Sequence, residues 1–337
     1  MHYIMLDEIQ LVENFADVLN EFLRKDNVDI YVTGSNARLL SKDVITEFRG
    51  RGHEIKMYPL SFAEYTSVTK SSLPLALDDY ETYGGLPQIF DYSTEEEKSS
   101  FLKNLLEETY IRDIEERYKV QKNESLSELL DLLASNIGCL TNPKKLADSF
   151  NSIVKGKLTR DTVQKYLSYF EDAFLIEKAV RFDIKGKNYI NYPLKYYFSD
   201  LGLRNARLNF RQIEKTHLME NVVFNELLIR GFNVDVWVVP VRGMDDEGNR
   251  TRAQLEIDFV CNKGSKRFYI QSAYALPSEK KIRQEIEPFI NVDDAFKKIV
   301  VVGNECRIHR DEQGITTMSI FDFLLNKDSL ELWTTVG

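Results

Sequence analysis

Residues 1–36, MHYIMLDEIQLVENFADVLNEFLRKDNVDIYVTGSN, decide the fold at the N-terminal end. An apolar run at 3–6 ends in Asp7-Glu8, and a second, at 28–33, ends in Gly34-Ser35-Asn36. Between these runs, apolar residues at helical spacing predict a helix over about 12–25: Val12, Phe15, Val18, Leu19 and Phe22. Strand, helix and strand in this order predict two parallel neighbouring strands joined by a right-handed crossover. Two such strands cannot cover both faces of their sheet, so we expect an incomplete parallel unit.

The first strand ends in two carboxylates, Asp7 and Glu8, as a Walker B strand does. In nucleotide hydrolases of that kind the Asp accepts a hydrogen bond from Mg²⁺-bound water, and the Glu orients and deprotonates the attacking water. Asn36 follows the next parallel strand, where ligands collect, and is a candidate sensor of the γ-phosphate or of the water. Arg49 and Arg51 are candidates to neutralise phosphate charge, in this subunit or in a neighbouring one. The alternative for the Asp7-Glu8 pair is a solvated strand end without chemistry.

Seven short motifs follow one another along nearly the whole chain: Asp7-Glu8-Ile9-Gln10, Thr33-Gly34-Ser35-Asn36, Gly50-Arg51, Tyr58-Pro59-Leu60-Ser61-Phe62, Gly84-Gly85-Leu86-Pro87, Thr162-Val163 with Tyr166-Leu167, and Tyr197-Phe198-Ser199-Asp200-Leu201-Gly202-Leu203. In this order they resemble a prokaryotic (archaeal-type) family of AAA P-loop ATPases that carry a C-terminal nuclease-like domain of unknown function. The resemblance implies that residues 1–71 are a partial AAA-type ATPase core with Walker B, sensor 1 and an arginine finger. It also implies ATP and Mg²⁺ as cofactors, with Asp7, Glu8, Asn36 and Arg51 as catalytic positions and Asp7 as the metal ligand.

The sequence departs from this family at one decisive point, because it contains no P-loop of the form GxxxxGK[ST]. The P-loop supplies the backbone N–H groups and the Lys that cradle the phosphates. We therefore expect either a truncated product of a longer gene or a natural variant without a nucleotide site. The parent activity is Mg·ATP hydrolysis coupled to binding of DNA or of a partner protein, and we expect this chain to be inactive alone. Its partner would then be the missing N-terminal half or another subunit of an oligomer.

Residues 139–192 are predicted to form a winged helix. Asn142-Pro143 starts one helix, and Thr159 starts a second helix with a continuous apolar face. An extended stretch at 175–182 and a turn at 185–187 complete the predicted wing. The segment 140–190 carries ten Lys/Arg against six Asp/Glu, and five polar side chains are expected to face DNA: Arg160, Gln164, Lys165, Lys185 and Lys187. The alternative is a packing or oligomerisation module with solvated lysines.

Residues 193–337 are predicted to form a degenerate nuclease-like α/β domain of the PD-(D/E)xK type. The layout that predicts it has helices at 217–230 and 278–290 and strands at 234–240, 255–262, 266–272 and 297–302. Such a nuclease needs an acid on a helix, an Asp on one strand and Glu-x-Lys on the next, and its acids hold Mg²⁺. Glu220, Asp258 and Gln271 occupy the three acidic positions, whereas Ala273 stands where the Lys should be. The candidate replacement for that Lys is Lys280 or Lys281 on the following helix.

Composition and charge limit the partners and the cellular compartment that we expect for the chain. A net charge of -9 and a pI near 5.2 argue against a globally basic nucleic-acid coat. Residues 91–131 carry twelve acids against six bases, which favours a solvated acidic face on a helical, lid-like region over 72–138. Three cysteines far apart predict reduced thiols in the cytoplasm. The longest apolar runs have the length of a strand, so we expect no contact with a membrane.

The predicted fold class is α/β, in which a truncated P-loop-type remnant precedes the helical region, the winged helix and the nuclease-like domain. Three functions remain open at this stage. The leading interpretation is an AAA-type ATPase relative. The second is a non-enzymatic DNA- or protein-binding module on a winged helix and a dead nuclease fold. The third is a Mg²⁺-dependent nuclease that uses Glu220 and Asp258, and we consider this activity the least favoured of the three.

Overall fold

We analysed a computed structural model of the chain, which describes residues 1–9, 12–34, 53–120, 124–154, 157–182, 194–211, 214–244 and 250–332. Within these ranges, the side chains of 242–244 and 250–253 are not considered. Five residues singled out by the sequence lie outside the described residues: Asn36, Arg49, Arg51, Lys185 and Lys187.

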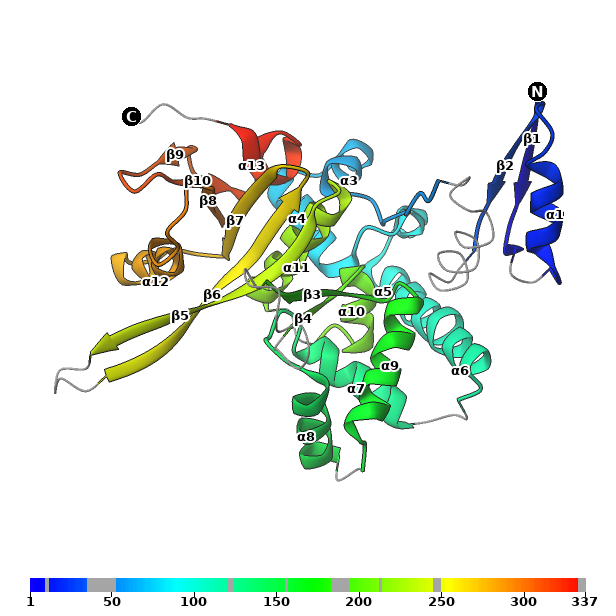
Figure 1. Cartoon of the computed structure of the whole chain (residues 1–337), viewed down its shortest axis with the longest axis horizontal. Coiled ribbons are helices and arrows are strands. Elements are labelled where there is room, and N and C mark those ends of the chain that lie inside the picture. The colour runs from blue at the N-terminus through cyan, green and yellow to red at the C-terminus, as the bar shows by residue number, and fades with distance from the viewer. Residues whose placement is uncertain are drawn as a thin grey trace.

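The N-terminal unit is the predicted strand, helix and strand. It consists of β1 (His2–Leu6), α1 (Phe15–Phe22) and β2 (Val28–Val32), and the two strands pair in parallel, as the sequence predicts. One face of the pair packs on α1 around the buried Leu19, and this small core is separate from the main one. On the other face, Tyr3 is 64% exposed and Met5 is 78% exposed, so one face of the sheet is uncovered. The unit lies to one side of the molecule (Figure 1).

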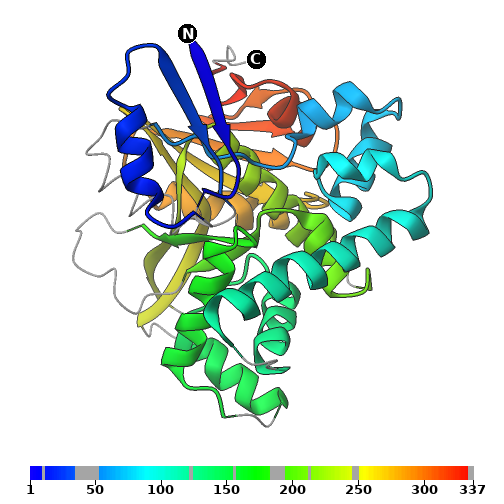
Figure 2. The same cartoon turned by 90° about the vertical axis from the view of Figure 1, so that its right-hand side faces the viewer.

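A helical region follows, and its helices run from light blue to blue-green in Figure 2. Its elements are α3 (Phe62–Val68), α4 (Leu73–Tyr83), η3 (Pro87–Asp91), α5 (Glu95–Asn104), η4 (Leu105–Ile111), α6 (Arg112–Tyr118) and α7 (Glu124–Ser135). Arg112 pairs with Glu108 and Glu116 one turn away, and all three side chains are more than half exposed. Exposed pairs of this kind add little stability. The acidic side of this segment is therefore a solvated face.

Two helices and two strands come next. The helices are α8 (Pro143–Val154) and α9 (Arg160–Asp172), and both begin at the predicted residue. Asn142 Oδ1 accepts a hydrogen bond from the Lys145 N–H at 2.8 Å, and Thr159 Oγ1 accepts one from the Thr162 N–H at 3.2 Å. These caps satisfy N–H groups that have no partner within their helix.

The strands after α9 pair with each other in antiparallel fashion, but the second of them lies beyond residue 192, where the predicted winged helix ends. They are β3 (Ile176–Arg181) and β4 (Lys195–Phe198). However, β3 also pairs in parallel with the first strand of the C-terminal sheet, β5 (Asn233–Met244). The predicted winged helix and the predicted nuclease-like domain thus share one sheet.

This sheet has eight strands among the described residues, in the order β4-β3-β5-β6-β7-β8-β10-β9. The remaining strands are β6 (Arg250–Lys263), β7 (Lys266–Ala273), β8 (Lys297–Val302), β9 (His309–Arg310) and β10 (Ile315–Ser319). The pair β5 and β6 forms a long antiparallel hairpin that extends away from the sheet (Figure 1). Because β7, β8 and β10 are parallel neighbours, the sheet is mixed.

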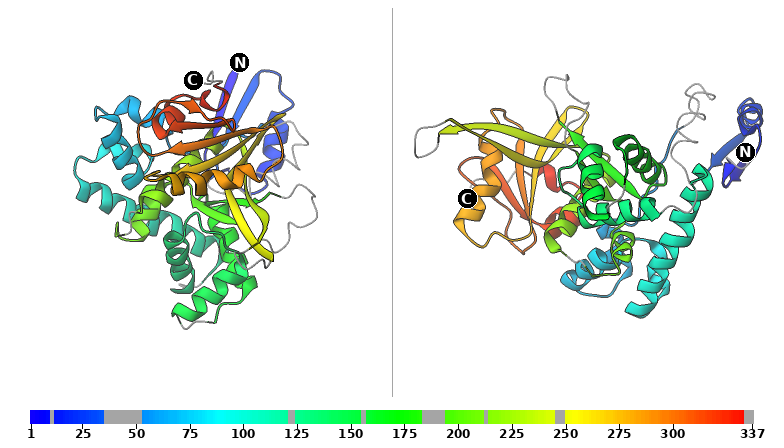
Figure 3. Two further views of the ribbon diagram at one scale, coloured as in Figure 1. Left: turned by 90° about the vertical axis from the view of Figure 1, so that its left-hand side faces the viewer. Right: turned by 90° about the horizontal axis from the view of Figure 1, so that it is seen from below.

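Helices cover both faces of the sheet. Its remaining helices are α10 (Leu201–Arg207), α11 (Lys215–Ile229), α12 (Glu279–Ile290), α13 (Ile320–Leu325) and η5 (Ser329–Glu331). Residues of α11 join the large core that also holds Phe259 and Ile270, whereas Phe289 of α12 joins a second core with Tyr269 and Ala273. Figure 3 shows α12, in orange, along the C-terminal strands. Of the helices in the described part, none is long and apolar enough to cross a membrane.

Candidate functional site

The ends of β1 and β2 bring Asp7 and Thr33 together. The Thr33 hydroxyl donates to Asp7 Oδ1, and the Glu8 N–H donates to the same oxygen at 3.1 Å. Glu8 has a φ of 48°, which is uncommon for a residue other than Gly and costs free energy. The parallel register explains the meeting, because Leu6 lies opposite Val32 and the next residues leave the sheet at the same edge. A carboxylate and a hydroxyl at this edge are oxygen ligands of the kind that Mg²⁺ takes.

Glu8 also lines a cavity of about 1010 Å³. The cavity wall includes parts of three motifs that lie far apart in sequence, namely Tyr58-Pro59, Leu86-Pro87 and Ser199-Asp200. Tyr110 of the π-helix η4 completes that wall. The N-terminal carboxylate therefore meets the helical region and the start of α10 in one hollow.

Asp200 ties two of these motifs together, and the third is joined to them where the Leu60 N–H donates to the Gly85 carbonyl oxygen at 2.8 Å. Its buried carboxylate accepts hydrogen bonds from the Gly85 N–H at 2.7 Å and the Leu203 N–H at 3.1 Å. Burial raises the pKa of Asp200 to about 6, although the backbone N–H groups around it lower the pKa in part. A Cβ atom on Gly202 would lie 2.1 Å from the Tyr83 carbonyl oxygen, so the chain passes closely there. These contacts are structural, and they set the wall of the cavity.

The predicted DNA-facing residues that the structure describes lie on α9. Arg160, Gln164 and Lys165 are exposed, whereas the opposite face of the helix is buried in the core. The Lys165 ammonium lies 5.9 Å from the centre of the Tyr169 ring. The helix thus presents a polar face with two cations.

A second cluster of charged side chains surrounds Lys195, which is the first residue of β4. The Lys195 ammonium donates to Glu220 Oε1 at 2.7 Å and lies 3.2 Å from Asp258 Oδ1. It also pairs with the Glu256 carboxylate. Lys195 is 2% exposed, and Glu220 and Asp258 are buried as well. Three carboxylates from α11 and β6 therefore share one buried ammonium.

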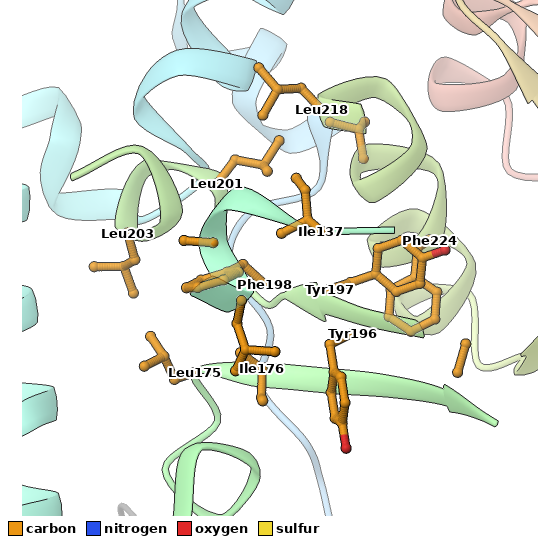
Figure 4. Close-up of a cluster of buried hydrophobic side chains, with 14 of the residues drawn as sticks. Ile137, Leu175, Ile176, Tyr196, Tyr197, Phe198, Leu201, Leu203, Leu218 and Phe224 are labelled. Carbon is orange, nitrogen blue, oxygen red and sulfur yellow. The ribbon is translucent and has the colours of Figure 1, made fainter. Parts of the chain in front are cut away.

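Neighbouring groups hold this cluster in position. The Asn221 side chain bonds both the N–H and the carbonyl of Phe198, so it satisfies the outer edge of β4. Tyr197 stacks on Phe224 with ring centres 4.1 Å apart, and its hydroxyl donates to Glu220 Oε1 at 2.7 Å. Figure 4 shows Tyr197 of β4 against Phe224 of α11. Because β4 and α11 are locked together, Lys195 and Glu220 keep their separation.

The charges in the cluster shift one another's protonation. Burial raises the pKa of Glu220 to about 7, although the Lys195 ammonium acts in the opposite direction. Burial also raises the pKa of Glu256. For Lys195, burial alone favours the neutral amine, but the carboxylates outweigh it and hold the pKa well above its ordinary value. The surrounding carboxylates therefore favour the charged form of Lys195.

The structure locates the other predicted nuclease-like positions. Gln271 Oε1 accepts a hydrogen bond from the Asp258 N–H at 3.4 Å, and the Ser272 N–H donates to Asp258 Oδ2 at 2.9 Å. Ala273 packs in the core on the α12 side of the sheet. Lys281 lies on α12, where it pairs with Glu285 and not with the acidic cluster.

A PD-(D/E)xK layout implies a divalent metal ion held by its carboxylates. Glu220 and Asp258 converge, as the sequence predicts, but an ammonium lies between them. Within the described ranges, no group of three or more His, Cys, Asp or Glu side chains is arranged to hold a metal ion. The residues as they stand do not fit a bound metal.

Sequence reasoning missed Lys195 and Tyr197 as members of this cluster. Lys195 precedes Glu220 by 25 residues and Asp258 by 63 residues, so no local spacing links them. The alternation along β4 was the available signal, because it places Lys195 and Tyr197 on one face of the strand.

Comparison with known proteins gives the family. Residues 1–66 match the family model of an AAA domain, and residues 75–214 match a domain of unknown function (DUF8612). An uncharacterized protein of Haemophilus influenzae is 33% identical over 328 residues, which cover 96% of this chain and 77% of that protein. Uncharacterized protein MJ1544 of Methanocaldococcus jannaschii is 30% identical over 328 residues, which cover 90% of this chain and 69% of that protein.

Among solved structures, protein VC1899 from Vibrio cholerae aligns with 98% of this chain and 89% of its own chain. Its sequence identity is 13% and its TM-score is 0.22, values too low to support an argument. The two sequence relatives and the AAA match are the informative findings. The chain therefore belongs to the family of these two uncharacterized proteins, and through residues 1–66 it is a relative of the AAA ATPases.

Proposed function

We propose that the chain is the subunit of an AAA-type ATPase in which Asp7, oriented by Thr33, binds the magnesium end of Mg·ATP. The observation that carries this proposal is the contact between the Thr33 hydroxyl and Asp7 at the shared edge of two parallel strands. Ligands of open parallel sheets bind at that edge. The match of residues 1–66 to an AAA domain supports the same assignment.

Each residue at this edge has a role that its position supports. The Asp7 carboxylate binds the cation or its water, and the Thr33 hydroxyl orients that carboxylate. Glu8, which follows directly, is the base that takes the proton of the attacking water. A bound magnesium ion supplies positive charge against the developing charge of the phosphates.

These residues fit the metal end of the nucleotide but not its phosphate end. The sequence contains no GxxxxGK[ST] segment, so no P-loop Lys neutralises the phosphates. We therefore expect this chain alone to bind Mg·ATP weakly and to leave it unhydrolysed. A phosphate-binding segment outside these residues would complete the site.

Coupling to a partner is the second part of the proposal. The polar face of α9, with Arg160, Gln164 and Lys165, is the surface that binds DNA or a partner protein. The cavity beside Glu8 supports coupling between the Asp7 edge and α9, because the cavity wall also includes Ala173 and Phe174 at the end of α9. A nucleotide-dependent change at Glu8 would thus reach the base of that helix.

A pure binding module is the competing function, and the exposed polar face of α9 favours it independently of any nucleotide. The two functions differ in one observable. The ATPase relative binds Mg·ATP through Asp7, whereas the binding module does not bind it.

Titration calorimetry of Mg·ATP into the chain tests the proposal. The variant Asp7→Ala removes the cation ligand, and Asp17→Ala is the matched control because Asp17 is an exposed acid on α1 of the same unit. We expect weak, saturable binding that Asp7→Ala abolishes and Asp17→Ala retains. No binding to the folded wild type, or equal binding to both variants, would contradict the nucleotide site and favour the binding module.

A further inference from the structure

The acidic cluster around Lys195 holds its own cation. Glu220, Glu256 and Asp258 contribute three carboxylates, and Lys195 contributes the only ammonium in contact with them among the described residues. We propose that Lys195 is a built-in cation that takes the place of a divalent metal ion, and that the cluster binds such an ion only when this ammonium is removed. The proposal is independent of the nucleotide site at Asp7.

The distances support an ammonium and oppose a metal ion in the present arrangement. The Lys195 nitrogen lies 2.7 Å from Glu220 Oε1 and 3.2 Å from Asp258 Oδ1. Mg²⁺ needs its oxygen ligands at about 2.0–2.1 Å, in a nearly octahedral arrangement. The Tyr197 hydroxyl also donates to Glu220 Oε1, so that oxygen already has two donors.

A separate observation indicates that the place is built for a cation. Ser272 is 7% exposed, and no described residue gives its Oγ a hydrogen-bond partner. Along β7, Ile270 faces the α11 side and Ala273 the α12 side, so alternation places Ser272 on the α11 side with Glu220. Its own N–H is bonded to Asp258 Oδ2 at 2.9 Å. A buried hydroxyl oxygen without a partner, on the side of the sheet that carries Glu220, is available as a further ligand for a cation.

Two physical effects explain why the ammonium is retained. Lys195 is part of the chain, so its effective concentration at the cluster is far above that of a free ion. A magnesium ion must also lose bound water to enter, which it does reluctantly. Glu256 is the open side of the cluster, because its side chain is 31% exposed whereas that of Lys195 is 2% exposed. Removing the ammonium would therefore leave a buried, highly negative place that an ion can reach.

The consequence is that the C-terminal domain operates without a resident metal. Metal-assisted cleavage of a phosphodiester needs a bound ion to activate water. With the ammonium in its place, the domain is a structural platform to which β4 is tied. The ion pairs join β4 to α11 and β6, and this joins the segment of α8 and α9 to the C-terminal sheet.

The test is Mn²⁺ binding by the variant Lys195→Met, measured by electron paramagnetic resonance and by the shift in thermal unfolding temperature. All proteins carry Asp7→Ala, so that the N-terminal edge contributes no ion. We expect one Mn²⁺ per chain in Lys195→Met, with an affinity at least tenfold higher than in the parent protein, and a rise in unfolding temperature on binding. Lys195→Arg keeps the cation and is expected to behave like the parent. Adding Asp258→Asn to Lys195→Met is expected to remove the gain.

Three outcomes would overturn the proposal. The parent protein binds one Mn²⁺ as tightly as Lys195→Met, the folded Lys195→Met variant binds none, or the gain persists with Asp258→Asn. If Lys195→Met does not fold in metal-free buffer, recovery of folding with Mn²⁺ supports the proposal. If Lys195→Met also fails to fold with Mn²⁺, the same Mn²⁺ measurement is made on Lys195→Met combined with Glu256→Gln. This double variant has one carboxylate fewer in the cluster, and it keeps the Glu220 and Asp258 ligands.

Discussion

Asp200 both caps a helix and joins two distant segments of the chain. Its carboxylate starts α10 by accepting the Leu203 N–H and, across the chain, accepts the Gly85 N–H. Two backbone donors therefore depend on a single buried side chain, and leaving buried donors unpaired costs about 1–3 kcal/mol each.

The protonation of Asp200 predicts a pH dependence of stability. Burial raises its pKa to about 6 in the folded chain from 3.8, so between these pH values the folded state holds a proton that the unfolded state releases. The stability from this group is greatest below pH 3.8 and is lost as the pH rises through 6. We expect the free energy of unfolding of wild type, relative to Asp200→Asn, to fall by about 1 kcal/mol between about pH 5 and pH 7. Urea denaturation at both pH values measures it, and parallel curves for the two proteins would refute it.

Gly202 is predicted to be intolerant of a side chain. A Cβ atom there would lie 2.1 Å from the Tyr83 carbonyl oxygen, so helices α10 and α4 would have to separate. We expect Gly202→Ala to lower the free energy of unfolding by about 2–3 kcal/mol. Gly264→Ala is the control: its Cβ meets nothing within 4 Å, so only its φ of 59° matters, and we expect about 1 kcal/mol. Equal losses in chemical denaturation would show that the contact at Gly202 is unimportant.

At the scale of elements, the sequence predicted most of the described strands and five of the described helices, but not how they are arranged. Periodicity predicted β1, α1 and β2, and the Thr159 cap predicted the start of α9. Cap residues and apolar spacing are local, so they are readable from the chain. The pairing of β3 with β5 joins residues far apart in sequence, and no local pattern encodes such a contact.

The acidic cluster around Lys195 was also only partly predictable from the sequence. Glu220 and Asp258 were recognised because each stands at a characteristic point of a nuclease-like layout. Lys195 was not recognised, because it lies on an edge strand outside that layout. Lys281, which was expected as a replacement for the nuclease lysine, lies on the other face of the sheet and pairs with Glu285. A buried charge is paired with groups that lie near it in the folded structure, whereas a sequence motif gives only the spacing along the chain.

The proposed contact of α9 with DNA can be tested at Lys165. Because Lys165 is exposed, its ammonium is available to a phosphate, and such contacts release counterions. We expect Lys165→Ala to weaken binding of duplex DNA similarly for all sequences and to reduce the slope of log affinity against log salt by about one. Fluorescence anisotropy at several salt concentrations measures this. Lys327→Ala, an exposed lysine near the C-terminal end of the described chain, controls for net charge. Unchanged affinity and slope in Lys165→Ala would assign α9 to a protein partner.

At the scale of the whole molecule, one sheet unites segments that the sequence presents as separate domains. β3 and β4 extend the C-terminal sheet, and Asp200 ties the region after β4 to the helical region. The match of residues 75–214 to one domain of unknown function also crosses the predicted limits at 138 and 192. The N-terminal unit, in contrast, has its own small core.

The most direct test of the nucleotide site is hydrogen–deuterium exchange by mass spectrometry with and without Mg·ATP. We expect slower exchange at the ends of β1 and β2, around Asp7 and Thr33, and no comparable change in β7 or β8. Asp7→Ala is expected to abolish this protection, and Asp17→Ala is expected to preserve it. Protection confined to the C-terminal sheet, or no protection of the N-terminal unit at saturating Mg·ATP, would rule out a nucleotide site at Asp7.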